Sequence, residues 1–189
     1  MQNDATDEDL ARLVQNGDME ALTALISRYE DKLLRYGRRL LPYENNIEDP
    51  VQDVFVSVYQ NIKDYDSTRK FSSWIYRIAH NAFVSVLRAK ARGPLYLEDF
   101  DRIIPHAVYE DPDAKEKEIM EMRVLIEKGI DQLSPVYREI ILLYYFEDFS
   151  YQEISDILHI PMGTVSARLG RAREALKKGL SPKIEKLYE

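Results

Sequence analysis

The spacing of hydrophobic positions predicts helices along most of the chain. Apolar residues return every three or four positions, as they do on one face of an α-helix, and alternating runs typical of strands are few. Only seven of the 189 residues are glycine, which also favours a helical protein over a strand-rich one. The pattern therefore predicts an all-α protein.

In the first half of the chain, capping and breaking residues divide this pattern into helices. Thr6, with Asp9 three residues later, is typical of a capped helix start. Asp49-Pro50 predicts a second capped start, because proline suits the first helical position. A long helix is expected over residues 71–91. Its apolar side is predicted to hold the following residues: Trp74, Ile75, Ile78, Ala82 and Val86.

An acidic segment with two prolines separates the two halves. Gly93-Pro94 ends the long helix, and no clear periodicity follows until about residue 117. We therefore predict two helical domains, residues 1–95 and 117–189, joined by an acidic linker over residues 96–116.

Near the C-terminus, the pattern predicts a helix-turn-helix. Ser150 and Glu153 form a capping box before a short helix with apolar residues at 154, 157 and 158. Pro161 and Gly163 suit the turn. The second helix has an apolar stripe made of the following residues: Val165, Leu169, Ala172 and Leu176. Its outer face is small and basic, as expected for a helix that enters the major groove of DNA.

The charge distribution supports binding to nucleic acid despite a formal net charge of −7. Residues 67–95 contain six Lys or Arg and no Asp or Glu, and residues 161–189 contain seven Lys or Arg against three Glu. Local patches decide whether phosphate is attracted nearby. In the first island, aromatic residues stand beside cations, a combination suited to single-stranded DNA.

Other functional classes find little support. The chain has no cysteine, which excludes disulfides and thiolate catalysis and fits a reducing compartment. No apolar run approaches the roughly 20 residues of a spanning helix, and the acidic N-terminus does not resemble a signal peptide. Three histidines, at 80, 106 and 159, lack metal-binding spacing. We expect a cytoplasmic protein that is neither an integral membrane protein nor an enzyme, with no metal or cofactor.

Three motifs in order resemble the sigma-70 family of RNA polymerase sigma factors, extracytoplasmic-function (ECF) type. "DPVQDVFVSVYQNI" resembles the region that docks on the polymerase clamp helices. "FSSWIYRIAHNAFVSVLRAKAR" resembles the region that melts and reads the −10 promoter element. "LSPVYREIILLYYFEDFSYQEISDILHIPMGTVSARLGRAREAL" resembles the region that reads the −35 element. The resemblance implies a factor that binds core RNA polymerase and promoter DNA and starts transcription. Many relatives are held by an anti-sigma partner.

The resemblance also implies three sets of site residues. Readers of the −35 element would be Thr164, Ser166, Ala167, Arg168, Gly170, Arg171 and Arg173. Readers of the −10 element would be Tyr65, Lys70, Trp74, Arg77, Asn81, Arg88 and Arg92. Contacts to the clamp helices would be made by Asp49, Gln52 and Asp53, and the segment 133–144 would take the flap tip of the polymerase. From the residues alone, Trp74 is instead expected in the core.

The chain departs from the family pattern at a few positions. A common threonine is Ser73, a common alanine is Ser155, and positions 166, 167 and 170 carry unusually small residues. Base readout at −35 would then depend less on long side chains and more on groove shape. An alternative is a helix-turn-helix regulator with an N-terminal effector domain, which would typically dimerise. Another is a protein-interaction module without salt-sensitive DNA binding.

Overall fold

The computed structural model describes residues 5–91 and 114–185, and all regular elements in these ranges are helices, which confirms the predicted all-α class. The helices are α1 (Asp7–Gln15), α2 (Met19–Leu40), α3 (Glu48–Asn61), the short 3-10 helix η2 (Ile62–Asp64), α4 (Phe71–Ala91), α5 (Ala114–Asp131), α6 (Pro135–Tyr145), α7 (Tyr151–Leu158) and α8 (Met162–Glu185). The predicted linker lies mostly outside the described residues, although α5 already begins at Ala114. No helix within the described ranges is both long and apolar enough to cross a membrane.

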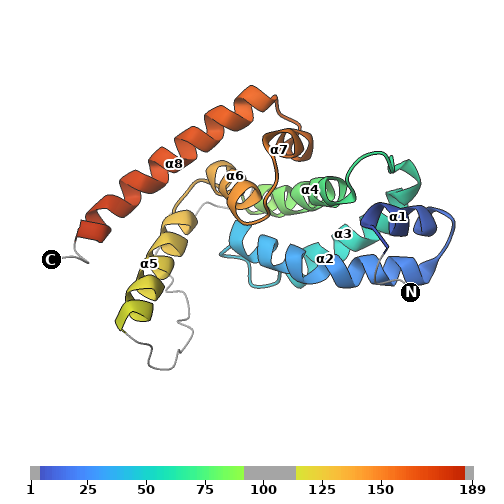
Figure 1. Cartoon of the computed structure of the whole chain (residues 1–189), viewed down its shortest axis with the longest axis horizontal. Helices are drawn as coiled ribbons and strands as arrows, with labels where there is room; N and C mark the ends of the chain where they lie inside the picture. Colours follow the sequence, from blue (N-terminus) through green and yellow to red (C-terminus); the bar gives the residue numbers. More distant parts are fainter. Residues whose placement is uncertain (1–4, 92–113, 186–189) are drawn as a thin grey trace.

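Helices α1 to α4 form the first unit of the molecule (Figure 1). The predicted cap of α1 is present, since Thr6 Oγ1 accepts a hydrogen bond from the Asp9 amide at 3.1 Å. Asp18 caps α2 in the same way, through the amides of the first turn. The centre of the unit is filled by large aromatic side chains that are almost wholly buried: Tyr29, Tyr36, Phe71, Tyr76 and Phe83.

Two details of this unit differ from the predictions. Helix α3 begins at Glu48, with Ile47 at the cap position, so Asp49 lies inside the first turn instead of capping it. Proline is tolerated there because the first-turn amides have no partner within the helix. The buried face of α4 is centred on Ile75, Ala79 and Phe83. The predicted Ile78, Ala82 and Val86 are only partly buried, beside α3.

Helices α5 to α8 form the second unit, with the helix-turn-helix in α7 and α8. Gly129 allows α5 to approach α8 closely, because a Cβ atom there would lie 2.8 Å from Leu180 Cδ2 and 2.9 Å from Leu176 Cδ1. Arg138 is buried, and its guanidinium donates to three carbonyls at the end of α5: Ile130, Asp131 and Leu133. The end of α5 is thereby capped from α6.

The two units pack against each other. Helix α4 contacts α7, and α2 contacts α6, so α4 lies between the rest of the first unit and the helix-turn-helix (Figure 1). The rings of Tyr76 and Phe149 meet edge to face across this boundary at 4.9 Å between centroids. One hydrophobic cluster consequently runs through both units, from Leu10 to Ala172.

Candidate nucleic-acid interface

The helix-turn-helix is built as the capping and apolar pattern predicted. Ser150 and Glu153 form the reciprocal capping box, with Glu153 Oε2 accepting from the Ser150 amide at 2.8 Å. The left-handed backbone position of the turn falls on His159, at φ 52°, and not on Gly163, which lies in the first turn of α8. Ser155 Oγ donates to the Ile160 carbonyl at 2.6 Å. The serine that departs from the family pattern thus fixes the turn.

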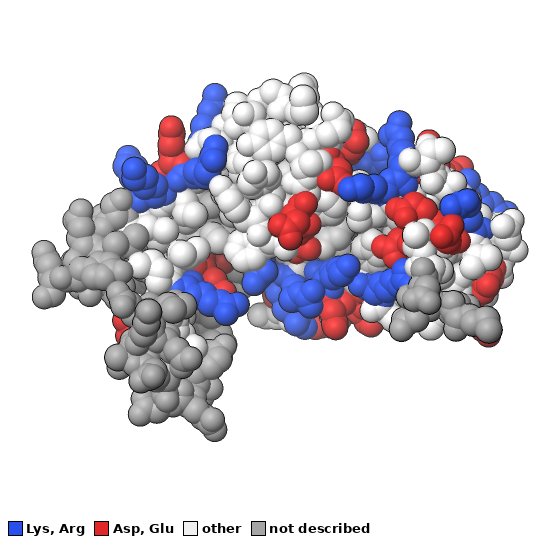
Figure 2. Space-filling view, in the orientation of Figure 1, with Lys and Arg blue, Asp and Glu red and all other residues white. Residues whose placement is uncertain are grey.

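Helix α8 presents the predicted −35 residues opposite its buried stripe. Val165, Leu169 and Ala172 are fully buried, as predicted, whereas Leu176, the fourth member of the predicted stripe, is only partly buried. The outward positions form the following set: Ser166, Ala167, Arg171 and Arg173 are exposed, and Thr164, Arg168 and Gly170 are half-buried. Figure 2 shows Lys and Arg side chains gathered over this helix. The face can therefore offer cations and hydrogen-bond donors to a groove of DNA.

Packing within the described residues does not require a glycine at position 170. A Cβ atom at this position would have no neighbour within 4 Å among the described residues. This contrasts with Gly129, where packing requires the missing side chain. Because Gly170 has no side chain, no atoms project from α8 at this position between Arg168 and Arg171. A partner surface could therefore approach the helix backbone there.

The predicted −10 residues of α4 divide between solvent and core. Asn81 and Arg88 are exposed, Arg77 is half-buried, and Arg92 lies outside the described residues. Trp74 is half-buried, its ring packing on Tyr65 and Phe71 at centroid distances of 5.1 and 5.6 Å. The ring thus belongs partly to the core and partly to the surface, between the two predictions made for it.

The loop before α4 is held in place from inside the first unit. Tyr65 is 4% exposed, and its hydroxyl donates to the Arg69 carbonyl. Burial and nearby carboxylates raise the pKa of Tyr65 to about 12, so it remains a donor at neutral pH. Lys70, at the end of the loop, is exposed and forms an ion pair with Glu153 of α7 at 2.8 Å.

Two residues that position this loop were not predicted from the sequence. Gln15, at the end of α1, donates from Nε2 to the carbonyls of Ile62 and Tyr65, each at 2.8 Å. Glu8 accepts from the Phe71 amide at 2.9 Å and so satisfies an unpaired donor in the first turn of α4. Their partners lie 47 to 63 residues away in sequence, so no local pattern could have revealed them.

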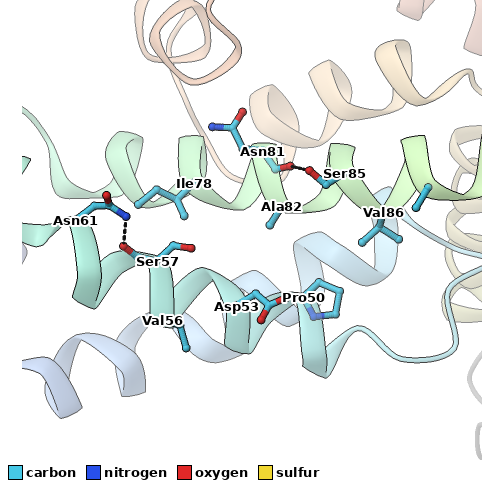
Figure 3. A pocket seen from close by; sticks show the side chains of 11 residues that line it. Pro50, Asp53, Val56, Ser57, Asn61, Ile78, Asn81, Ala82, Ser85 and Val86 are labelled. Atoms are coloured by element: carbon cyan, nitrogen blue, oxygen red, sulfur yellow. Dashed lines mark hydrogen bonds between the residues drawn. The ribbon is translucent and has the colours of Figure 1, made fainter.

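A groove between α3 and α4 brings two predicted sets of residues together (Figure 3). Its volume is about 720 Å³, and its lining includes Asp53 and Val56 of α3 with Ile78, Asn81 and Val86 of α4. Asp53 belongs to the predicted polymerase set and Asn81 to the predicted −10 set. The Asn81 side chain points away from α3 (Figure 3). One amide at the rim could therefore contact DNA while α3 contacts protein.

The outer face of α3 mixes carboxylates with exposed apolar groups. Asp49, Gln52 and Asp53 are all exposed, as are the side chains of Val56 and Tyr59 at 53% and 54%. Asp49 is oriented by a hydrogen bond from Asn46 Nδ2 at 2.6 Å. Val56 and Tyr59 are three positions apart on α3, so this face offers two exposed apolar side chains beside its carboxylates.

Comparisons with known proteins agree with this division into two units. The family descriptions "Sigma-70 region 2" and "Sigma-70, region 4" match residues 25–93 and 123–176. The chain is 35% identical over 176 residues to the ECF RNA polymerase sigma factor SigW of Bacillus subtilis, covering 88% of this chain and 92% of that one. It is 33% identical to an ECF RNA polymerase sigma-E factor of Haemophilus influenzae, over 96% of this chain and 99% of the relative.

Solved structures show the same fold. The structure of CnrH in complex with the cytosolic domain of CnrY matches with a TM-score of 0.69 and 25% identity, covering 94% of this chain and 99% of that one. The sigma factor RpoE of Bartonella quintana, solved with the anti-sigma factor NepR, matches with a TM-score of 0.62 and 23% identity over 84% and 96% of the two chains.

The class defined by these two units is that of a transcription initiation factor with a helix-turn-helix. The chain belongs to the sigma-70 family of RNA polymerase sigma factors and, within it, to the ECF type. Because the family match includes the first unit, the alternative of a regulator with an unrelated N-terminal effector domain is not supported.

Proposed function

We propose that this sigma factor reads promoter DNA at two points while bound to core RNA polymerase. In this proposal, α8 reads the −35 element, and α4 with the preceding loop reads and opens the −10 element. The exposed face of α3 docks on the clamp helices, and α6 takes the flap tip. In the same proposal the two domains comprise residues 1–95 and 117–189, and residues 96–116 join them, although α5 already begins at Ala114. The protein acts in the cytoplasm and catalyses no reaction of its own.

The observation that carries the proposal is the outer face of α8. Its arginines lie opposite the fully buried residues Val165, Leu169 and Ala172. Gly170 leaves no side chain between these arginines, and packing does not require a glycine there. In the first unit, Asn81 and Arg88 are exposed along α4, and Gln15 and Glu8 fix the loop that precedes this helix. A fixed loop suits base flipping, since unstacking costs a few kcal/mol that contacts to the flipped base must repay.

A partner protein of the anti-sigma type is a further part of the proposal. It is supported by the similarity to CnrH, which was solved in complex with the cytosolic domain of CnrY. The exposed apolar side chains on α3 give such a partner a surface to bind.

Run-off transcription with core polymerase tests the function. Adding the protein to core polymerase is expected to give promoter-specific transcripts from some members of a promoter library. If no member yields a transcript that depends on the protein, the proposal is wrong.

The role of α8 is tested by Arg171→Ala in the holoenzyme. Binding to promoter DNA is measured across a salt series, and the slope of log K against log salt is expected to fall by about 0.9 if one phosphate contact is lost. The matched control is Arg123→Ala, because Arg123 is also exposed but pairs with Glu127 on α5. Equal slopes for both variants would contradict a DNA contact by Arg171.

A further inference from the structure

A row of cations lies along one face of α2, apart from the two basic islands of the sequence. Residues 32–43 contain four Lys or Arg and no Asp or Glu. Arg28, Lys32, Arg35 and Arg39 are spaced by four, three and four positions, so they share one face of the helix. We call these four residues the α2 stripe. Figure 2 shows Lys and Arg side chains in a row over the place where Figure 1 draws α2.

The fold does not use the charges of Lys32 and Arg35. Both side chains are exposed. Within the described residues, α2 forms its ion pairs through Arg28 and Arg38, and not through Lys32 or Arg35. Asp31 is exposed one turn before Arg35 but does not pair with it in this part of the chain. The two charges are therefore available to a partner.

Aromatic rings orient two members of the α2 stripe. Lys32 Nζ lies 5.0 Å from the centroid of the Tyr29 ring, and the Arg39 guanidinium lies 4.3 Å from the centroid of the Phe146 ring. A ring face attracts a cation without neutralising it, so both side chains keep their full charge and their N–H donors. Cations beside aromatic rings are a combination that proteins use to hold single-stranded DNA.

One carboxylate of the second unit lies near the stripe. Burial raises the pKa of Glu147, and the Tyr76 hydroxyl together with Arg35, Arg39 and Lys32 opposes this rise. Three cations thus act on a single carboxylate. The stripe keeps a net positive charge and would attract an anionic partner.

The stripe begins beside the loop that is proposed to hold a flipped base. Arg28 pairs with Asp7 of α1 at 2.7 Å, and the next residue of α1, Glu8, accepts from the Phe71 amide at the end of the loop at 2.9 Å. The rings of Tyr29 and Phe71 also meet, at 5.5 Å between centroids. A DNA strand that leaves the loop on this side would therefore meet Arg28 first and the rest of the stripe after it.

We propose that the α2 stripe is a third DNA contact, which binds the backbone phosphates of the opened promoter strand after that strand leaves the loop. This rests on the proposed function, in which α4 and the loop open the −10 element. Phosphate contacts position a strand without reading its bases. The stripe would thus hold the opened strand away from its complement, whatever the base sequence there.

The test measures how a single-stranded extension changes binding of the holoenzyme to promoter DNA. Two forked probes expose the non-template strand of the −10 element. One ends at the element, and the other continues past it by about 16 Å, the length of the stripe at 1.5 Å per residue. The variant is Lys32→Gln/Arg35→Gln. The control Arg38→Gln/Arg123→Gln loses the same two charges at exposed positions outside the stripe, and Lys32→Arg/Arg35→Lys keeps both charges in place.

For the wild type, the extension is expected to strengthen binding and to steepen the slope of log K against log salt by about 0.7 for each phosphate contact. Lys32→Gln/Arg35→Gln should lose about 1.4 of this slope on the long probe and little on the short one. The control and the charge-retaining variant should match the wild type. Replacing the phosphates of the extension with uncharged methylphosphonates should remove the gain for the wild type.

The proposal is overturned if the extension adds nothing for the wild type, or if the glutamine variant gains as much from it. Weaker binding of that variant to core polymerase, with the wild-type salt slope on DNA, would assign the stripe to a protein contact and would also overturn it. Run-off transcription by the wild type separates the two proposals. Normal promoter-specific transcription without an effect of the extension overturns the third contact alone, whereas no transcription from any promoter overturns the proposed function.

Discussion

Gln15 makes the contact with the clearest consequence for promoter opening. Its side-chain amide donates to the carbonyls of Ile62 and Tyr65, each at 2.8 Å, and so joins α1 to the loop that is proposed to cradle a flipped base. Gln15→Ala removes both bonds. At about 0.5–1.5 kcal/mol for each bond, we expect the free energy of unfolding to fall by about 1–3 kcal/mol. For a chain of this size, each kcal/mol lowers Tm by about 2–4 °C.

Loss of the Gln15 contacts should also slow opening of promoter DNA. With the loop released from α1, the holoenzyme is expected to open the −10 element more slowly, measured by the fluorescence of 2-aminopurine placed in that element. Binding to a −35 duplex should not change, because α8 lies in the other unit.

The neighbouring residue provides the control. Asn16 also donates from its side-chain amide to a carbonyl, that of Arg12 at 2.9 Å, but this bond stays within α1. Asn16→Ala should therefore leave opening of the −10 element unchanged. If Gln15→Ala and Asn16→Ala had the same effect on stability and on opening, the assignment of Gln15 as the anchor of the loop would be wrong.

Four further substitutions test packing and hydrogen bonding in the two units. Leu169→Ala should lower the free energy of unfolding by about 2–5 kcal/mol, because Leu169 is fully buried on the inner face of α8. An unchanged Tm by circular dichroism would contradict this prediction. Gly37→Ala should destabilise by about 1–3 kcal/mol, since its Cβ would lie 2.7 Å from Ile47 Cγ2. Gly170→Ala, where the Cβ meets nothing, should stabilise by up to about 1 kcal/mol in urea unfolding; effects of the same sign for both glycines would refute the argument. Ser155→Ala should cost about 0.5–1.5 kcal/mol through loss of its bond to the Ile160 carbonyl, and equal urea midpoints for variant and wild type would show that this bond contributes nothing.

Local pattern was sufficient for the helix-turn-helix. The capping box at Ser150 and the stripe at Val165, Leu169 and Ala172 follow from residues three or four positions apart, and the structure confirms them. The buried face of α4 was predicted less well. Helix α4 has neighbours on several sides, so the apolar residues beside α3 could not be told from those facing the centre.

Contacts between distant residues escaped prediction altogether. Gln15 and Glu8 act on backbone groups 47 to 63 positions away, and Tyr36 meets Glu139 across 103 positions. Polar side chains on helices are usually solvated, so nothing in the sequence distinguishes these from their exposed neighbours.

The union of both units in a single chain has a consequence for how the factor would respond to its concentration. Docking of α6 on α2 is intramolecular, so the linking segment sets a fixed effective concentration of one unit around the other. Dilution or overexpression of the factor would then leave the fraction of chains with α6 docked on α2 unchanged, whereas inhibition by a separate protein depends on how much of each protein is present. The amount of undocked factor would therefore rise and fall in proportion to the total amount of the factor.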